Sequence, residues 1–181
     1  MAESLTLPEE ITFQQAIEVT QSLMEYMERG EIPEAETGKT IAQLVRSENG
    51  ARGFFVTYLT DDRPFADQPS PAVVEALQSS PEVVSELLVK NLAMSTGMAI
   101  AHRRNENEAM AQGSDRVQRR TIHLIELTQL SEVAEKAKKL HESTVTGQGD
   151  YQTFLDRWGY DAEQRQAIQL AVKQVVRETL D

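Results

Sequence analysis

The sequence contains no cysteine among its 181 residues. This absence excludes disulfide bonds, thiolate catalysis and cysteine-bound zinc or iron–sulfur clusters. The chain also lacks a basic, apolar leader segment, and no apolar run reaches the roughly 20 residues that a membrane span needs. The most apolar stretch, residues 92–101, is too short and contains Ser95 and Thr96. We therefore predict a cytoplasmic protein with no membrane span.

Basic residues are also scarce. The chain has 18 Lys and Arg against 29 Asp and Glu, a formal net charge of −11, which argues against nucleic-acid binding because phosphate contacts need clustered cations. The excess of acidic side chains is unevenly distributed along the chain. Residues 1–48 hold 10 acidic and 3 basic side chains, whereas residues 113–146 hold 5 and 6. An anionic ligand would meet the second region more readily than the first.

Hydrophobic periodicity predicts an all-α fold, a single-domain bundle of six to eight helices around a central helix near residues 81–112. Ser80 as a cap and Pro81 at the first helical position mark the start of that helix, and Gly113 marks its end. Residues 1–11 are expected to form a flexible N-terminal arm. Residues 12–181 are expected to form the single helical domain, which is long enough to bury a core.

The central helix carries small residues at every fourth position, namely Ala93, Gly97 and Ala101. Residues at this spacing share one face of a helix. A neighbouring backbone can therefore come close to this face, and we predict close packing or an interface there. A homodimer could form through the same surface.

The first two helices have recognisable ends. Thr12 and Gln15 form a capping-box pattern at the start of the first helix, and Gly30 ends it. A second helix is expected from about Pro33 to Glu48. These patterns place two helices before residue 50.

Residues 54–60 are rich in the side chains that are enriched in strands. We nevertheless favour helix, because no second strand-like run is present to pair with them. Further helices are predicted at about 115–143 and at 162–179. Between these two, a short helix and its flanks are expected to form an aromatic lid from Tyr151, Phe154, Trp158 and Tyr160.

Catalytic and metal-binding patterns are nearly absent. Residues 37–40, Thr-Gly-Lys-Thr, resemble the end of a phosphate-binding loop, but the first glycine is missing and Glu34 and Glu36 would repel phosphate. A glutamate three residues before a histidine, which di-iron bundles need, does not precede any of His102, His123 and His141. We predict no catalytic residue, no metal and no cofactor.

One group of cations remains as a candidate site. If the helices on either side of Gly113 form an antiparallel hairpin, residues at equal distances from the turn come side by side. The cations that would then gather could bind a carboxylate, a phosphate or an acidic partner helix; they are His102, Arg103, Arg104, Arg119, Arg120 and His123. We favour the alternative that nearby carboxylates neutralise them, as surface ion pairs commonly do; the candidates are Glu106, Glu108 and Glu126.

Two functional hypotheses follow. The first is a non-enzymatic helical protein that acts through protein–protein interaction, in assembly or regulation, with a protein partner or a second copy of itself. The scarcity of catalytic patterns favours this hypothesis, although it leaves the question of an enzyme open. The rival hypothesis is a small-anion binding protein or enzyme that uses the arginine cluster.

Overall fold

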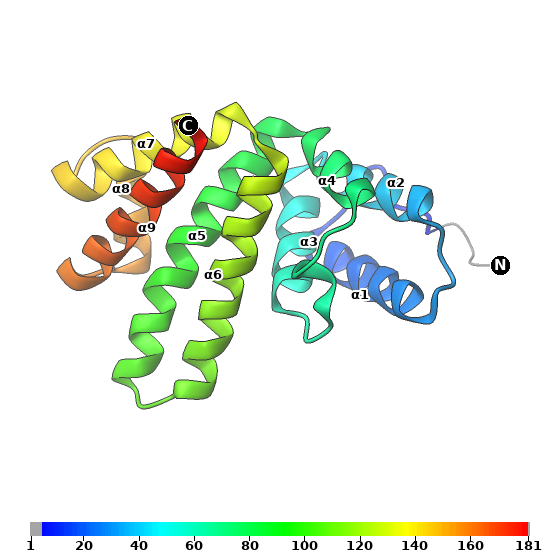
Figure 1. Cartoon of the computed structure of the whole chain (residues 1–181), viewed down its shortest axis with the longest axis horizontal. Coiled ribbons are helices and arrows are strands. Elements are labelled where there is room, and N and C mark those ends of the chain that lie inside the picture. The colour runs from blue at the N-terminus through cyan, green and yellow to red at the C-terminus, as the bar shows by residue number, and fades with distance from the viewer. Residues whose placement is uncertain (1–4, 181) are drawn as a thin grey trace. The chain divides into compact units, whose positions relative to one another are not determined.

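The computed structural model describes the backbone of residues 5–180 and the side chains of residues 5–176. This part of the chain is all-helical, as predicted, and the chain divides into two compact units, Met1–Leu87 and Leu88–Asp181. One long helix, α5, continues from the first unit into the second. In chain order the elements are α1 (Phe13–Arg29), α2 (Glu34–Leu44), α3 (Glu48–Thr60), a 3-10 turn (Pro64–Ala66), α4 (Pro71–Gln78), α5 (Pro81–Arg104), α6 (Glu108–Thr128), α7 (Ser131–Thr146), α8 (Gln152–Trp158) and α9 (Ala162–Leu180) (Figure 1).

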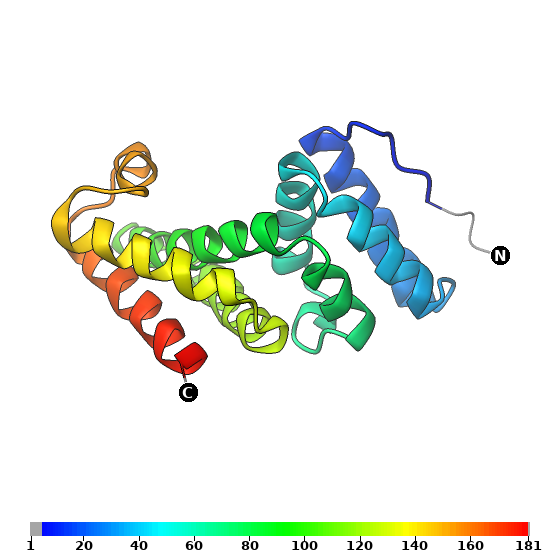
Figure 2. The same ribbon diagram turned by 90° about the horizontal axis from the view of Figure 1, so that it is seen from above.

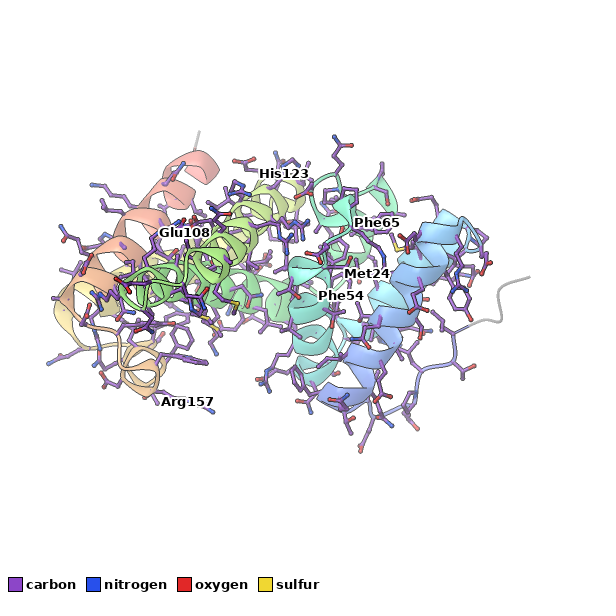
Figure 3. The ribbon with its side chains drawn as sticks, turned by 90° about the horizontal axis from the view of Figure 1, so that it is seen from below. Met24, Phe54, Phe65, Glu108, His123 and Arg157 are labelled. Atoms are coloured by element: carbon purple, nitrogen blue, oxygen red, sulfur yellow. The ribbon has the colours of Figure 1, made fainter. Side chains whose placement is uncertain are left out.

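The core of the N-terminal unit lies where α1 and α3 pack together. Met24 of α1 and Phe54 of α3 are fully buried, and they lie between the two helices (Figure 3). The helices come close because Gly53 has no side chain. A Cβ at this position would overlap Ala16 and would lie 2.8 Å from the carbonyl oxygen of Phe13.

Helix ends in the N-terminal unit confirm several predictions. The hydroxyl of Thr12 accepts a hydrogen bond from the N–H of Gln15 at 3.1 Å, which forms the predicted capping box. Gly30 ends α1 in the left-handed conformation. Residues 54–60 are helical, as the lack of a partner strand indicated.

The predicted second helix at 33–48 is present as α2, but its predicted end at Glu48 was wrong. α2 ends at Leu44, and α3 begins after Ser47, whose hydroxyl accepts a hydrogen bond from the N–H of Gly50 at 3.1 Å. Gly50 is needed at this break because a Cβ there would overlap the carbonyl oxygen of Leu44. Asn49 and Gly50 therefore belong to the first turn of α3.

The predicted end of the central helix was also wrong. α5 ends at Arg104, and Glu106 adopts a left-handed conformation with φ 55°. The N–H groups of Glu106 and Asn107 bond back to the carbonyls of Arg103 and His102 at 3.1 and 2.9 Å, a Schellman motif. The side chain of Asn107 then caps α6 by accepting from the N–H of Met110. The turn was missed because glutamate is not a typical residue for this conformation.

The single helix expected at 115–143 is divided into α6 and α7. Gln129 ends α6 in the left-handed conformation, with φ 47° and ψ 42°. This conformation costs about 1–2 kcal/mol for a residue other than glycine, so propensity alone did not indicate the break. With this division the described residues form nine α-helices, slightly more than the predicted six to eight.

In the C-terminal unit, α5 and α6 form an antiparallel hairpin, and α7 lies beside α9 (Figures 1 and 2). The aromatic lid forms in part. The ring of Phe154 lies edge-on to the rings of Tyr151 and Tyr160, with centroids 6.5 Å apart in both pairs. Trp158 does not join them in these ring contacts and is 48% exposed.

The predicted N-terminal arm falls partly outside the described residues. Within the described part, Ile11 is buried, and Leu5 and Leu7 are half-buried. Residues 5–9 and Ile11 line a groove of about 700 Å³ together with α2 and the residues just after it, including Lys39 and Arg46. Flexibility of the arm and folding of residues 12–181 as one domain stay predictions, since two compact units can unfold together or apart.

One helix in the described part, α5, is long and apolar enough to cross a membrane. Of its most apolar window, 61% is buried inside the fold, and core helices pass the same test of length and composition. This single helix is weak evidence for a membrane span. The absence of a span stays a prediction.

The two glycines at Gly53 and Gly113 give a matched test of the packing in this fold. We expect Gly53→Ala to destabilise the protein by about 1–3 kcal/mol, because the new methyl group overlaps α1. Gly113→Ala should stabilise it by about 0.5–1 kcal/mol, because Gly113 lies inside α6 with no atom near a new Cβ. Urea unfolding followed by circular dichroism measures both. Equal effects of the two changes would contradict the α1–α3 contact.

Candidate functional site

The pairing of α5 with α6 decides which of the predicted cations meet. The side chain of Gln118 donates a hydrogen bond to the hydroxyl of Thr96 at 2.9 Å, so residue 118 lies opposite residue 96. This pairing places Arg120 opposite the region of Met94. Arg104 is ten residues further along α5, or about 15 Å at the rise of an α-helix. Because the turn lies at 105–107 and not at Gly113, the hairpin does not bring the predicted pairs together.

Arg103 lies at the tip of the hairpin and is neutralised by two carboxylates of α6. Its guanidinium contacts Asp115 at 2.6 Å and Glu108 at 3.2 Å. The hydrogen bond to Asp115, followed by that to Glu108, raises the pKa of Arg103 above its ordinary value. Arg103 is therefore a fixed cation that holds α5 and α6 together at the turn.

Arg104 reaches the start of α9 instead. Its guanidinium contacts Asp161 and Glu163, each at 2.5 Å, and these hydrogen bonds raise its pKa. The pKa of Asp161 is lowered, first by the bond from Arg104 and then by the backbone N–H of Gln164. A lowered pKa keeps Asp161 charged, so this contact should weaken only as the pH falls through the acidic range.

The remaining predicted cations do not gather at the hairpin tip. Arg119 is exposed, Arg120 is buried with 3% of its surface accessible, and His123 is half-buried. Figure 3 shows Glu108, which contacts Arg103, and His123 toward opposite ends of α6. His102 is half-buried, and its Nε2 has no hydrogen-bond partner among the described residues. The shared geometry that suggested anion binding is therefore absent at the hairpin tip. Anion binding by these residues stays a prediction.

Gly97, the centre of the predicted small-residue face, lies against a residue from the same chain. A Cβ at Gly97 would overlap Cε1 of Tyr160 and lie 3.0 Å from its Cδ1. The side chain of Gln164 donates a hydrogen bond to the carbonyl oxygen of Gly97 at 3.0 Å. Ala93 is fully buried and Ala101 is half-buried. The close neighbour of Gly97 is thus an aromatic ring and not a second backbone.

We call this set of contacts between α5 and the start of α9 the α9 anchor. Its members are Gly97 and Arg104 of α5, together with Tyr160, Asp161, Glu163 and Gln164. Sequence patterns did not indicate the α9 anchor. Asp161 and Gln164 exchange two hydrogen bonds of 3.0 Å as a capping box, and the Asp-x-x-Gln pattern could have predicted the cap. No local signal links these residues to α5.

The net charge of the protein lies wholly in the N-terminal unit. Residues 1–87 contain 16 Asp and Glu against 5 Lys and Arg, a net charge of −11. Residues 88–181 contain 13 of each kind, so their net charge is zero. Among the residues with described placement, no three His, Cys, Asp or Glu side chains gather to hold a metal ion. The acidic surface is the main electrostatic feature of the chain.

A model of the family described as "uncharacterised conserved protein UCP020893" matches residues 12–175. The chain belongs to this family. The match begins just before α1 and extends into α9, so it spans both units. No curated protein and no solved structure gives a significant match.

Tyr160 carries a buried hydroxyl that has no hydrogen-bond partner among the described residues. Burial raises its pKa to about 12. An unfolded tyrosine loses its proton near pH 10, so the unfolded chain releases this proton first as the pH rises. The contribution of this group to stability is therefore complete below about pH 10 and is lost as the pH rises toward 12.

We expect Tyr160→Phe to leave stability at pH 7 unchanged or to raise it by about 1 kcal/mol, because the variant removes an unpaired buried hydroxyl. As the pH rises from 10 to 12, this variant should also lose less stability than the wild type does. The control is Tyr58→Phe, which should cost about 1 kcal/mol because the Tyr58 hydroxyl donates to the carbonyl of Phe65 at 3.0 Å. Melting temperatures across this pH range measure both. An equal loss of stability in Tyr160→Phe and Tyr58→Phe at pH 7 would contradict the conclusion that the Tyr160 hydroxyl is unpaired.

Proposed function

We propose that the protein is a non-enzymatic, partner-binding protein whose acidic N-terminal unit recognises a basic surface on another protein. The observation that carries this proposal is the charge distribution, with −11 on residues 1–87 and zero on residues 88–181. Such a one-sided charge steers association with a partner of opposite sign. An assembly or regulatory role in the cytoplasm is part of the same proposal.

The contact surface that we propose lies along α1 and α3. Phe13 and Val56 are large apolar side chains with 36% and 45% of their surface exposed. The guanidinium of Arg52 lies 5.0 Å from the centre of the Phe13 ring, and Val56 is one helical turn further along α3. Aromatic and arginine side chains are enriched at the energetic centres of protein interfaces. This small apolar patch would supply affinity, while the acidic surface of the unit would supply steering.

The acidic side chains of α1 fit this arrangement. Glu18 and Glu25 are exposed and two turns apart on the outer side of α1. Both are available to pair with lysine or arginine of a partner.

The test compares a face variant with a matched control. Phe13→Ser with Val56→Ser removes the exposed apolar side chains of the proposed surface. Val145→Ser with Leu170→Ser removes two side chains of the C-terminal unit that are 58% and 63% exposed. Each protein is purified gently from its own cells, and its retained partners are identified by native mass spectrometry at low and high salt.

We expect the wild type and the control to retain a protein with a basic surface. The face variant should retain about ten-fold less of that protein or even less, because it lacks a central aromatic contact. Raised salt should release the same protein. A partner that all three proteins retain equally would refute the α1–α3 surface. Retention of a small anion in place of a protein would favour the rival hypothesis.

A further inference from the structure

The joint between α6 and α7 consists of Gln129 and Leu130 only. Gln129 has a left-handed backbone, and its N–H makes a single backbone hydrogen bond, to the carbonyl of Ile125 at 3.2 Å. Leu130 precedes α7 and provides no side-chain cap. The joint therefore combines an unfavourable conformation with a start of α7 that has no side-chain cap.

The other left-handed helix ends of the chain are better supported. Gly30, Gly147 and Gly159 adopt this conformation without steric cost. Glu106 also adopts this conformation although it is not a glycine. The Schellman hydrogen bonds and the cap from Asn107 hold its turn. Gln129 is not a glycine, and its turn has neither Schellman hydrogen bonds nor a side-chain cap on the next helix.

The sequence around the joint is compatible with one continuous helix. Residues 114–146 contain neither glycine nor proline, and their periodicity predicts a helix across positions 129 and 130. A straight joint would turn Gln129 to right-handed helix and would give the first N–H groups of α7 carbonyl partners in the last turn of α6. The bend in Figure 1 is thus imposed by what lies beyond it in the chain.

The contacts that impose the bend are those of the α9 anchor. α7 and α9 pack on each other, and α9 contacts α5 through Tyr160, Gln164 and the carboxylates at Arg104. These side-chain contacts require α9 to sit on an α5 hairpin. They do not require that the hairpin belong to the same chain.

We propose that α7–α9 exchange between two copies of this chain, with α6 and α7 joined as one straight helix and each α9 anchored on the α5 of the other copy. The two anchors of such a dimer reproduce the contacts within one chain, and both joints are relieved. A short, strained connection between two packed parts is the condition under which such exchange occurs. The partner is therefore a second copy, bound through its own fold.

The joint is tested by two substitutions at Gln129. Gln129→Gly favours the bend and disfavours a continuous helix, while Gln129→Ala does the reverse. We expect the dimerisation constants of the two variants to differ by about 100-fold or more, with the alanine variant the stronger dimer, because a dimer contains two joints. Analytical ultracentrifugation over a range of protein concentrations measures the constants. The same pair of substitutions at Glu106 is the control, and should leave dimerisation unchanged.

The exchange itself is tested by charge reversal across the anchor. One variant carries Arg104→Glu, and the other carries Asp161→Asn with Glu163→Arg, in which asparagine retains the cap of α9. Each variant alone has mismatched anchors, whereas an exchanged dimer of the two restores an opposite-charge contact at the reversed pair. We expect native mass spectrometry of the mixture to show the mixed dimer in excess over both same-variant dimers.

Three results would overturn the proposal. The first is a wild type and a Gln129→Ala variant that both stay monomeric at the highest concentration. The second is a dimer whose strength does not depend on the residue at position 129. The third is a mixture of charge-reversed variants in which the three dimers appear in statistical proportion.

Discussion

The close contact between Gly97 of α5 and Tyr160 at the start of α9 is the constraint on which the C-terminal unit depends. The absence of a side chain at Gly97 makes room for the ring, and Gln164 and Arg104 fix the same end of α9 by hydrogen bonds. α9 in turn packs on α7 and also contacts α6, so this contact helps to orient both α7 and α9. In the account proposed here, the bend at Gln129 follows from this contact, because the local sequence favours a straight helix there.

The two units divide the properties of the chain between them. The N-terminal unit carries the whole net charge and an exposed apolar patch at Phe13 and Val56. The C-terminal unit is electrically balanced, and its arginines at the hairpin tip are paired with carboxylates. In the account proposed here, the first unit binds a basic partner and the second associates with a second copy. A protein that does both could bring two partner molecules together.

The sequence predicted the helical class and several of the helix ends that depend on local caps. Thr12 and Gly30 at α1 and Pro81 at α5 are examples, since each acts within one turn. The ends at Glu106 and Gln129 were not predictable, because neither residue favours the left-handed conformation. The hairpin geometry assumed for the candidate arginine cluster was wrong because the turn at Glu106 was not predicted. That geometry assumed a turn at Gly113, which is an interior residue of α6.

The most direct test of the account is the effect of Gly97→Ala on the free energy of unfolding in two backgrounds. In the wild type, we predict a loss of about 1–3 kcal/mol, because the new methyl group overlaps the Tyr160 ring. In a Tyr160→Ala background the ring is gone, and the same change should be neutral or stabilising by up to about 1 kcal/mol, as expected for alanine inside a helix. An equal loss in both backgrounds would show that Gly97 and Tyr160 are not coupled, and would contradict the account.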